Sequence, residues 1–294
     1  MVLNIAVMHA NGRTGRRIAR SLLQAGARVT ALGRSRERMA DLEALGATVH
    51  AGDPHDAAWL TSALEGVDTV YGLLPYDVSV PGYLATQRRL GVAMATAVRN
   101  AGIRRLVFLS SVGAELPEGT GMLGSLHEQE QRLRALPGTH TLMLRAGAFM
   151  ENLHGVMPLV RELGIVADAV EPDLALPMVA SRDIADAAVR ALLDPSWSGS
   201  VVREVLGPRD ISFNEVARIL AVRTGTESLS YVQMPYGEYE ATLAQAGFAA
   251  DTAALTTELA RAINARRVQS RLGRTADSTT PTGFEEFSAE LTAV

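Results

Sequence analysis

Short apolar segments rich in β-branched residues alternate with helical patterns over the first half of the chain. The predicted strands cover residues 3–8, 29–32, 47–50, 69–74, 106–109 and 141–144. Between them, leucines at helical spacing predict helices, and several of these end at a glycine such as Gly46, Gly66 or Gly102. This alternation is typical of βαβ units. The sequence therefore predicts an α/β fold with a parallel sheet covered by helices on both faces.

The alternation loosens after Gly147, where prolines interrupt a region expected to be extended or rich in loops. Further helices are predicted over residues 183–193 and 213–224, and further strands over 201–206 and 231–234. We expect residues 1–150 to form a doubly wound domain to which residues 181–206 return. Residues 151–180 and 207–294 would form a smaller C-terminal α/β lobe. The Ser/Thr-rich segment 275–282 is expected to be a flexible connector, after which Phe284 and Phe287 dock the end of the chain.

Composition excludes several classes of function. The 294 residues contain no cysteine, so disulfides and thiolate chemistry are absent, and the six histidines match no metal-ligand spacing. All 28 basic residues are arginine and the net charge is −4, which disfavours direct nucleic-acid binding and excludes lysine Schiff bases. No apolar segment approaches the roughly 20 residues of a membrane span, and no signal peptide precedes the first strand, so we expect a cytoplasmic protein that does not bind membranes.

A glycine turn links the first strand to the first helix in the segment IAVMHANGRTGRRIA, residues 5–19. Two glycines there would let the backbone approach a dinucleotide pyrophosphate, and the first N–H groups of the helix would face its charge. An ordinary strand-to-helix turn is the alternative interpretation. His9 stands where such turns usually have their first glycine. The residues predicted to bind the pyrophosphate are His9, Asn11, Gly12, Arg13, Thr14 and Gly15.

The end of the second predicted strand indicates which dinucleotide is bound. An acidic residue there would bind the ribose 2′-OH of NAD, but this chain has Arg34, which suits the 2′-phosphate of NADP(H). Arg13 would supply a second cation. Residues after the third and fourth strands are expected to flank the adenine and the middle of the dinucleotide, with a turn cap as the alternative role for Asp53. These residues are Gly52, Asp53, Leu73, Leu74 and Pro75.

Several motifs together resemble one family along essentially the whole chain. They are the turn at residues 9–15, Arg34 in a G-R-S setting, LVFLSS at 106–111, LRAGAFMEN at 144–152 and SRDIA at 181–185. The chain resembles the NmrA-like branch of the atypical short-chain dehydrogenase/reductases. The resemblance implies a Rossmann domain with a smaller substrate lobe, and NADP(H) held across the strand ends. It also implies backbone contacts to the nicotinamide carboxamide from Ala146, Gly147 and Ala148. Ser110, at the end of the fifth strand, would hydrogen-bond the nicotinamide or the substrate, with simple termination of the strand as the alternative.

The catalytic pair of the usual short-chain dehydrogenases, Tyr-x-x-x-Lys, is missing. The chain has no lysine and no tyrosine between Val112 and Arg145. Relatives of isoflavone reductase carry a lysine at the position aligned with Leu126, whereas the quinone and dye reductases of the family resemble this chain in lacking it. Hydride transfer to a quinone or a cationic dye leaves a stabilised product, which takes its proton from water, so orientation is the main task of the protein.

Two titratable side chains are candidate proton donors. His127 has a pKa suited to proton exchange at neutral pH, although a solvated residue in the first turn of a helix is the alternative. Tyr76 follows the fourth strand and would donate to a substrate carbonyl or simply pack against its loop. The predicted substrate-binding residues are Tyr76, Tyr83, Phe149, Met150 and Asn152.

The sequence thus favours an NADPH-dependent reductase of conjugated small molecules, working without a Tyr/Lys dyad as a monomer or homodimer. Two alternatives stay open. A non-catalytic regulator would sense NADP(H) and bind a protein partner. A pathway-specific ketoreductase or ene-reductase would need His127 or Tyr76 as its acid.

Overall fold

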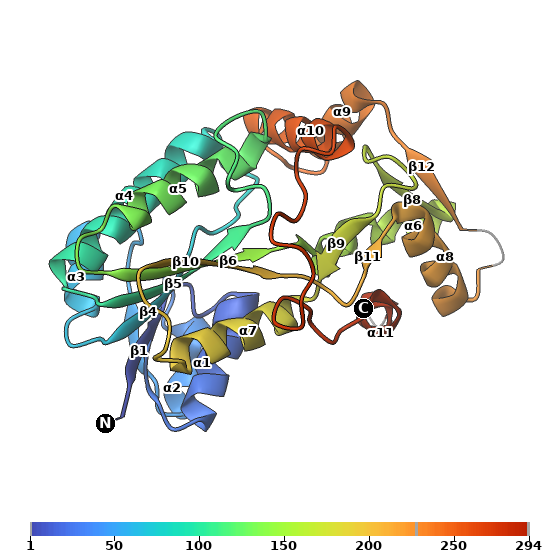
Figure 1. Ribbon diagram of the computed structural model, residues 1–294. Helices are drawn as coiled ribbons and strands as arrows, with labels where there is room; N and C mark the ends of the chain where they lie inside the picture. The colour runs from blue at the N-terminus through green and yellow to red at the C-terminus, as the bar shows by residue number, and fades with distance from the viewer. Residues whose placement is uncertain (1, 227–228, 293–294) are drawn as a thin grey trace.

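Seven parallel strands form the central sheet of the computed structural model, which describes residues 2–226 and 229–292 (Figure 1). The strand order is β3-β2-β1-β4-β5-β6-β10. This order confirms the predicted doubly wound, Rossmann-like sheet, because the chain reverses direction across it between β1 and β4. The strands are β1 (Asn4–Val7), β2 (Arg28–Gly33), β3 (Thr48–Ala51), β4 (Thr69–Leu73), β5 (Arg105–Ser111), β6 (His140–Ala146) and β10 (Ser200–Val205).

Helices cover both faces of this sheet (Figure 1). One face carries α1 (Arg13–Gln24), α7 (Ser181–Leu193) and the short α2 (Ala40–Ala44), which follows the 3₁₀ turn η1 (Glu37–Met39). The other face carries α3 (Ala57–Ala63), α4 (Tyr83–Asn100) and α5 (Gly124–Arg134), the last preceded by η2 (Gly121–Leu123). Ile18 and Leu22 of α1 are fully buried, as their spacing of four residues predicts. A separate apolar core lies under each helical layer.

The second lobe contains two small sheets, with strand orders β11-β9-β7 and β12-β8. The region after Gly147 is more regular than expected. Pro158 lies in the first turn of a helix, where a missing N–H costs nothing. The lobe holds β7 (Ala148–Phe149), η3 (Met150–Val156), α6 (Met157–Leu163), β8 (Ile165–Asp168), β9 (Leu176–Val179), β11 (Asp210–Ile211), α8 (Phe213–Thr224), β12 (Ser230–Gln233), α9 (Tyr236–Gln245), α10 (Ala250–Asn264) and α11 (Phe284–Thr292).

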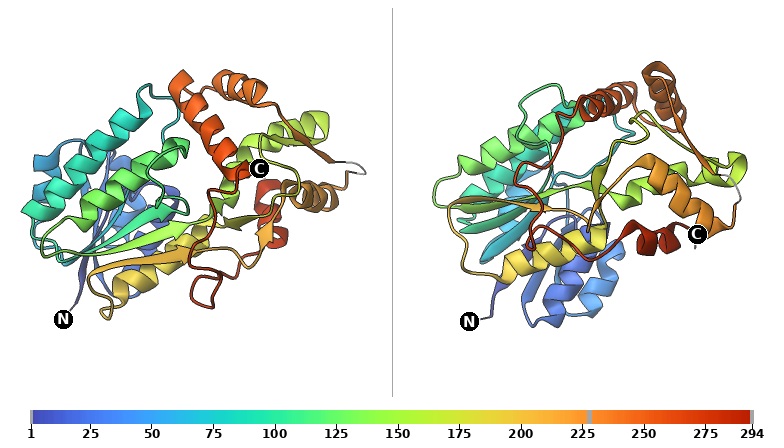
Figure 2. Two further views of the ribbon diagram at one scale, coloured as in Figure 1. Left: turned by 45° about the horizontal axis from the view of Figure 1, so that its top comes forward. Right: turned by 45° about the vertical axis from the view of Figure 1, so that its right-hand side comes forward.

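The prediction of a flexible connector at residues 275–282 is wrong. The segment runs back beside the Rossmann domain (Figure 2). Two backbone hydrogen bonds of 2.8 Å attach it to Leu206: the N–H of Leu206 donates to the carbonyl of Ser278, and the carbonyl of Leu206 accepts from the N–H of Thr280. Thr282 is buried and donates to Asp183 at 2.9 Å. The hydroxyls that suggested a linker therefore satisfy buried partners. Phe284 and Phe287 are 2% and 1% exposed, so their predicted docking is confirmed.

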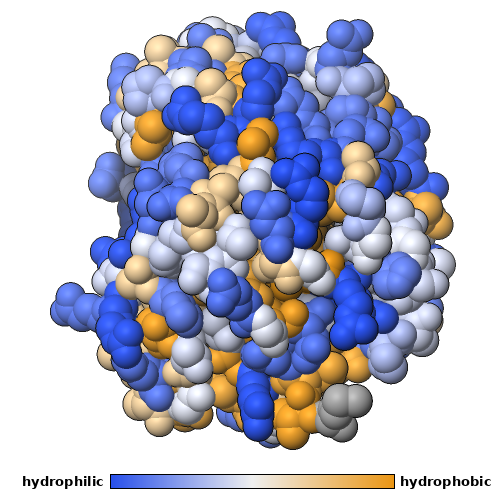
Figure 3. Space-filling view, turned by 90° about the vertical axis from the view of Figure 1, so that its left-hand side faces the viewer, coloured by the Kyte–Doolittle hydropathy of each residue, from blue (hydrophilic) through white to orange (hydrophobic). Residues whose placement is uncertain are grey.

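The outer face of the Rossmann domain mixes both kinds of side chain. Figure 3 shows hydrophilic residues over most of its upper part and apolar residues between them toward the lower part. Val2 and Leu45 are both 55% exposed. No helix among residues 2–226 and 229–292 is long and apolar enough to cross a membrane.

Candidate functional site

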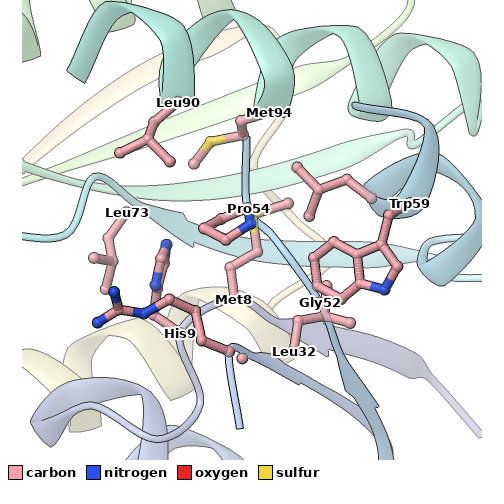
Figure 4. Close-up of a pocket in the computed structure, with 12 residues that line it drawn as sticks. Met8, His9, Leu32, Gly52, Pro54, Trp59, Leu73, Leu90 and Met94 are labelled. Atoms are coloured by element: carbon pink, nitrogen blue, oxygen red, sulfur yellow. The ribbon is translucent and has the colours of Figure 1, made fainter. Parts of the chain in front are cut away.

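A pocket lies at the carboxyl ends of β1 to β4 (Figure 4). This edge is where doubly wound sheets bind ligands, because loops diverge there at the reversal of strand order. The structure brings four predicted cofactor residues, one from each strand end, around this pocket: His9, Arg34, Gly52 and Leu73. Leu90 and Met94 project from α4 to close its upper side, and Met8, Leu32, Gly33, Pro54, Trp59 and Leu60 complete the lining.

The turn after β1 explains both the unusual histidine and the glycine that follows it. His9 has a φ of 52°, in the left-handed region where glycine is normally favoured. A Cβ on Gly15 would lie 2.4 Å from the His9 carbonyl oxygen, so only glycine lets α1 pack this closely against the turn. Burial lowers the pKa of His9 to about 4, with smaller contributions from the charges of Arg34 and His55. The His9 ring is therefore neutral at physiological pH.

The first turn of α1 is open to an anion. Its N-cap residue, Gly12, provides no side-chain cap, and the first turn contains no acidic residue. Arg13 is exposed beside it, and Asn11 lies next to Gly33 at the end of β2. Thr14 instead faces inward, because its hydroxyl is buried and accepts a 3.2 Å hydrogen bond from Tyr71. Its side chain therefore supports the turn from beneath, and the predicted contact with the pyrophosphate would have to come from its backbone N–H.

Arg34 is an exposed cation at the mouth of the pocket. Neighbouring arginines have acidic partners: Arg36 pairs with Glu43, and Arg16 with Asp41. Within the part of the chain that the structure describes, the guanidinium groups of Arg34 and Arg13 form no ion pair or hydrogen bond. Their charges are therefore available to a phosphate, which accepts charge-assisted hydrogen bonds from arginine.

The residues after β3 have structural partners. Asp53 accepts hydrogen bonds from the backbone N–H and the ring Nδ1 of His55, both at 2.9 Å, and these bonds lower the pKa of its carboxyl. The alternative interpretation of Asp53 as a turn cap matches this geometry. Gly52 leaves room for Trp59, because a Cβ on it would come within 2.3 Å of the indole ring.

The loop after β4 is also fixed within the Rossmann domain. Leu74 is partly buried and packs against the core beneath α3 and α4. The carbonyl of Pro75 accepts a 2.7 Å hydrogen bond from Nε2 of Gln87. Leu73, one residue before these two, is the member of the predicted set that reaches the pocket.

A buried ionic network lies at the ends of β5 and β6. Arg145 donates two hydrogen bonds to Glu130, at 2.9 and 2.7 Å, and a third to Glu115 at 2.9 Å. Ser110 donates to Glu130 at 2.7 Å and is itself buried, so its hydroxyl is engaged inside the domain. Sequence reasoning missed this network. The only available signal was a single arginine in an otherwise apolar strand.

Two aromatic side chains meet at the boundary between the domain and the lobe. Tyr76 is 55% exposed, and its ring contacts that of Tyr83 edge-on, with centroids 6.3 Å apart. Tyr83 is 7% exposed, and this burial raises the pKa of its phenol to about 12. Phe149 is half-buried against the Rossmann core, and Asn152 is exposed. Met150 is only 2% exposed and packs in the core of the lobe.

His127 does not line the pocket. It lies in the first half of α5, and its Nδ1 is 2.9 Å from the carbonyl oxygen of Ala114. This contact ties the helix to the loop after β5. Tyr76 is also absent from the pocket lining, so neither predicted proton donor lies among the residues around it.

Comparison with known proteins agrees with this architecture, because the NmrA-like family model matches residues 2–288. The chain belongs to the NmrA-like family. It is 30% identical to an NAD(P)H azoreductase from Xenophilus azovorans over 75% of this chain and 74% of that protein. It is 28% identical to quinone oxidoreductase 2 of Escherichia coli, over 83% and 82% of the two chains. The structure of a Citrobacter sp. triphenylmethane reductase complexed with NADP(H) shares the fold, with a TM-score of 0.81, 19% identity and coverage of 98% and 99%.

The motifs on which the resemblance to the NmrA-like family rests join the domain to the lobe. In LRAGAFMEN, the Glu151 carboxylate accepts hydrogen bonds from the backbone and hydroxyl of Ser181, at the start of α7. In SRDIA, Asp183 accepts from Thr282 and Arg182 pairs with Glu286 of α11. Glu151, Arg182 and Asp183 therefore position the lobe.

Gly147 stands at the centre of this junction between the buried Ala146 of β6 and the exposed Ala148 of β7. Its N–H donates to the carbonyl of Val205 at 3.0 Å, and a Cβ on it would lie 1.9 Å from the carbonyl oxygen of Pro177. The backbones of the central sheet and the lobe meet here at a distance that admits only glycine.

Proposed function

We propose that this protein is an NADPH-dependent reductase that transfers hydride to a planar, conjugated small molecule such as a quinone or a dye. The observation that carries the proposal is the pocket at the strand ends, with the unpaired Arg34 at its mouth beside the uncapped start of α1. The azoreductase and quinone oxidoreductase relatives support the reaction class. Because one fold hosts unrelated functions, the argument rests on the site as well as on the family.

The residues present fit NADPH. The N–H groups of the first turn of α1 and the Arg13 side chain would hold the pyrophosphate, and Arg34 would hold the 2′-phosphate. The apolar walls formed by Leu32, Trp59 and Met94 suit the adenine ring. When bound, the cofactor supplies a hydride from its nicotinamide ring.

The protein's own contribution is orientation and a flat apolar contact. Tyr76, which is 55% exposed and is backed edge-on by the buried Tyr83, presents aromatic surface beside the carboxyl end of β4, where a planar acceptor would stack. A Tyr/Lys dyad is not required, because the acceptor itself delocalises the charge that the hydride brings. The proton of the reduced product comes ultimately from water.

The test of the proposed function is NADPH consumption with a panel of quinones, azo dyes, triphenylmethane dyes and enones. Oxidation of NADPH in the presence of a quinone or dye, with the reduced acceptor identified as product, is the expected result. Tight NADPH binding without turnover across the panel would contradict the proposal and favour the regulator, whose protein partner would then be sought.

Exchanging Arg34 for glutamate should reverse the preference between the two dinucleotides. The change removes the cation assigned to the 2′-phosphate and supplies an acid for a ribose hydroxyl. Loss of one charge-assisted hydrogen bond corresponds to about 1.5–3 kcal/mol, so NADPH affinity should fall roughly 10- to 100-fold while NADH affinity holds or rises. Both affinities are measured by titration.

The matched control for this change is Arg36→Glu, two residues further along. It alters net charge equally, but Arg36 already pairs with Glu43 and does not line the pocket. This control should retain its preference for NADPH. If Arg34→Glu and Arg36→Glu behave alike, the assignment of Arg34 to the 2′-phosphate fails.

Replacing His127 with alanine should leave the rate of quinone reduction within about twofold of the parent. Its Nδ1 is engaged with the Ala114 carbonyl, so the expected cost is one hydrogen bond, about 1 kcal/mol of stability. Steady-state rates and thermal unfolding check this together. A rate loss of two or more orders of magnitude would instead make His127 a general acid.

A further inference from the structure

The backbone of His9 is left-handed at the position where such a turn usually has its first glycine. Its φ is 52°, and among residues 2–226 and 229–292 only Arg266 is also a non-glycine residue with a positive φ. A side chain in this region carries backbone strain that glycine avoids. Strained residues of this kind concentrate at ligand sites, so the presence of a histidine here needs a functional explanation.

The ring of His9 is the part of this residue that can meet a ligand. Its carbonyl is used within the turn, where it accepts a 2.9 Å hydrogen bond from the N–H of Gly12. The side chain lines the pocket, on the side where Leu73 lies (Figure 4). Across the residues that the structure describes, neither ring nitrogen has a hydrogen-bond partner. A polar ring that faces a pocket in this way is ready to bind a group inside it.

Backbone hydrogen bonds bring His9 to the same place as Arg34. The N–H of Ala10 donates to the carbonyl of Leu32 at 2.9 Å, which ties the turn to the end of β2. The carbonyl of Gly33, next to Arg34, accepts a 3.0 Å hydrogen bond from the loop after β3. His9 and Arg34 both line the pocket. The ends of three adjacent strands thus place an imidazole and a free guanidinium at one cavity.

The charged groups on the elements around the ring favour an anion. Arg34 ends β2, and Arg13 lies in the first turn of α1. His55, after β3, also affects the charge of His9, and its Nδ1 is held by Asp53 at 2.9 Å. The residues of β4 and α4 that line the pocket are uncharged. Because the ring is neutral at physiological pH, it stands beside these arginines without the repulsion that a third cation would meet.

We propose that the His9 ring donates a hydrogen bond to the 2′-phosphate of NADP(H) and, with Arg34, selects the phosphorylated dinucleotide. This inference rests on the proposed function, and it assigns the ring to the adenosine end of the cofactor instead of the pyrophosphate. A neutral imidazole has one N–H donor and a phosphate dianion only accepts, so the bond forms without protonation of the ring. NADH has a hydroxyl there, which gains less, because hydrogen bonds to charged groups are the stronger ones.

Two substitutions at residue 9 separate the hydrogen bond from the shape of the turn. Glycine fits a left-handed backbone, so His9→Gly should keep the turn and the midpoint of thermal unfolding. Its NADPH affinity should fall about 10-fold at neutral pH, while its NADH affinity stays within twofold, because the lost bond belongs to the 2′-phosphate. His9→Phe keeps an aromatic ring without an N–H and should show the same loss. Titration with each dinucleotide measures these affinities.

Fragments of the cofactor isolate the 2′-phosphate from hydride transfer. Adenosine 2′,5′-bisphosphate carries this group and adenosine 5′-monophosphate lacks it. The parent should bind the bisphosphate more tightly, and His9→Gly should lose about 10-fold of that preference. Arg266→Gly is the matched control, because it replaces the other left-handed residue, which follows α10 and does not line the pocket. This control should keep the affinities of the parent within twofold.

The possible results distinguish this inference from the proposed function. Equal losses of NADPH and NADH affinity in His9→Gly, or no loss of either, would overturn the assignment of His9 and leave the reductase in place. Full discrimination by His9→Phe would overturn the hydrogen bond, because ring shape alone would then suffice. A parent protein that prefers NADPH but reduces no acceptor would overturn the proposed function alone. A loss confined to the ligands with a 2′-phosphate, and absent from Arg266→Gly, supports the inference.

Discussion

A Gly147→Ala variant should lose about 3 kcal/mol or more of its free energy of unfolding. The added methyl would lie 1.9 Å from the Pro177 carbonyl oxygen, and backbone on both sides prevents the contact from relaxing at a side chain. Relief would require separating β7 from β9, where Ala148 pairs with Met178. Because β7 follows β6 of the central sheet directly through Gly147, this separation would also disturb the junction with the lobe, and reductase activity should fall with stability. Urea unfolding and NADPH turnover measure the two effects.

Gly124→Ala is the matched control for Gly147→Ala. Gly124 begins α5, and a Cβ there would meet no atom within 4 Å. The same chemical change should therefore be neutral or stabilise the protein by up to about 1 kcal/mol, because alanine favours helix and restricts the unfolded chain. If both variants lose similar stability, the close backbone approach at Gly147 does not explain the need for glycine there.

An Arg145→Ala variant should be destabilised by about 3–5 kcal/mol near neutral pH. Glu130 is 1% exposed and receives two hydrogen bonds from Arg145, so removing the cation leaves a buried carboxylate with too few partners. Burial opposes the ionisation of Glu130, but Arg145 and Ser110 outweigh it and lower its pKa in the folded protein. The parent therefore gains stability from this group above about pH 4.3, the ordinary pKa of glutamate, and loses it as pH falls through the lowered value.

The destabilisation of Arg145→Ala should shrink in acid, because a protonated Glu130 no longer needs the cation. Chemical unfolding at several pH values would record this. Arg134→Ala is the control, since Arg134 meets the same carboxylate at 2.9 Å but its side chain is 34% exposed. We expect a loss near 1 kcal/mol there. A loss for Arg145→Ala that is the same at pH 4 and pH 7 would contradict the electrostatic explanation.

Most strands and helices of the Rossmann domain could be predicted from local patterns in the sequence. The predicted strands all overlap observed ones, and the helix predicted over residues 213–224 is the observed α8, where Ser212 and Glu215 form a capping box. Such signals lie within a few residues of the structure they specify. The placement of Arg34 and His9 at one pocket also followed from local signals, because parallel strands end at the same edge.

Contacts between distant segments were beyond this kind of reasoning. Asp183 and Thr282 are 99 residues apart, so no periodicity or spacing relates them. A serine at a strand end suggested a ligand contact for Ser110, yet its partner Glu130 lies on a helix 20 residues later. The Ser/Thr-rich segment 275–282 suggested mobility because the partners of its hydroxyls, such as Asp183, lie far away in the sequence. In each case a partner supplied by the tertiary fold decides the role.

The path of the chain has a consequence for how the protein is made. The central sheet lacks its edge strand until residues 200–205 have been synthesised, and the buried carboxylate of Asp183 lacks its partner until Thr282 follows. An N-terminal fragment emerging from the ribosome therefore carries an open sheet edge and an unsatisfied acid, both of which invite association with other chains. Completion of the native state waits for the last helices. The need for chaperones during translation should accordingly increase with the time that the ribosome takes to synthesise residues 150–282.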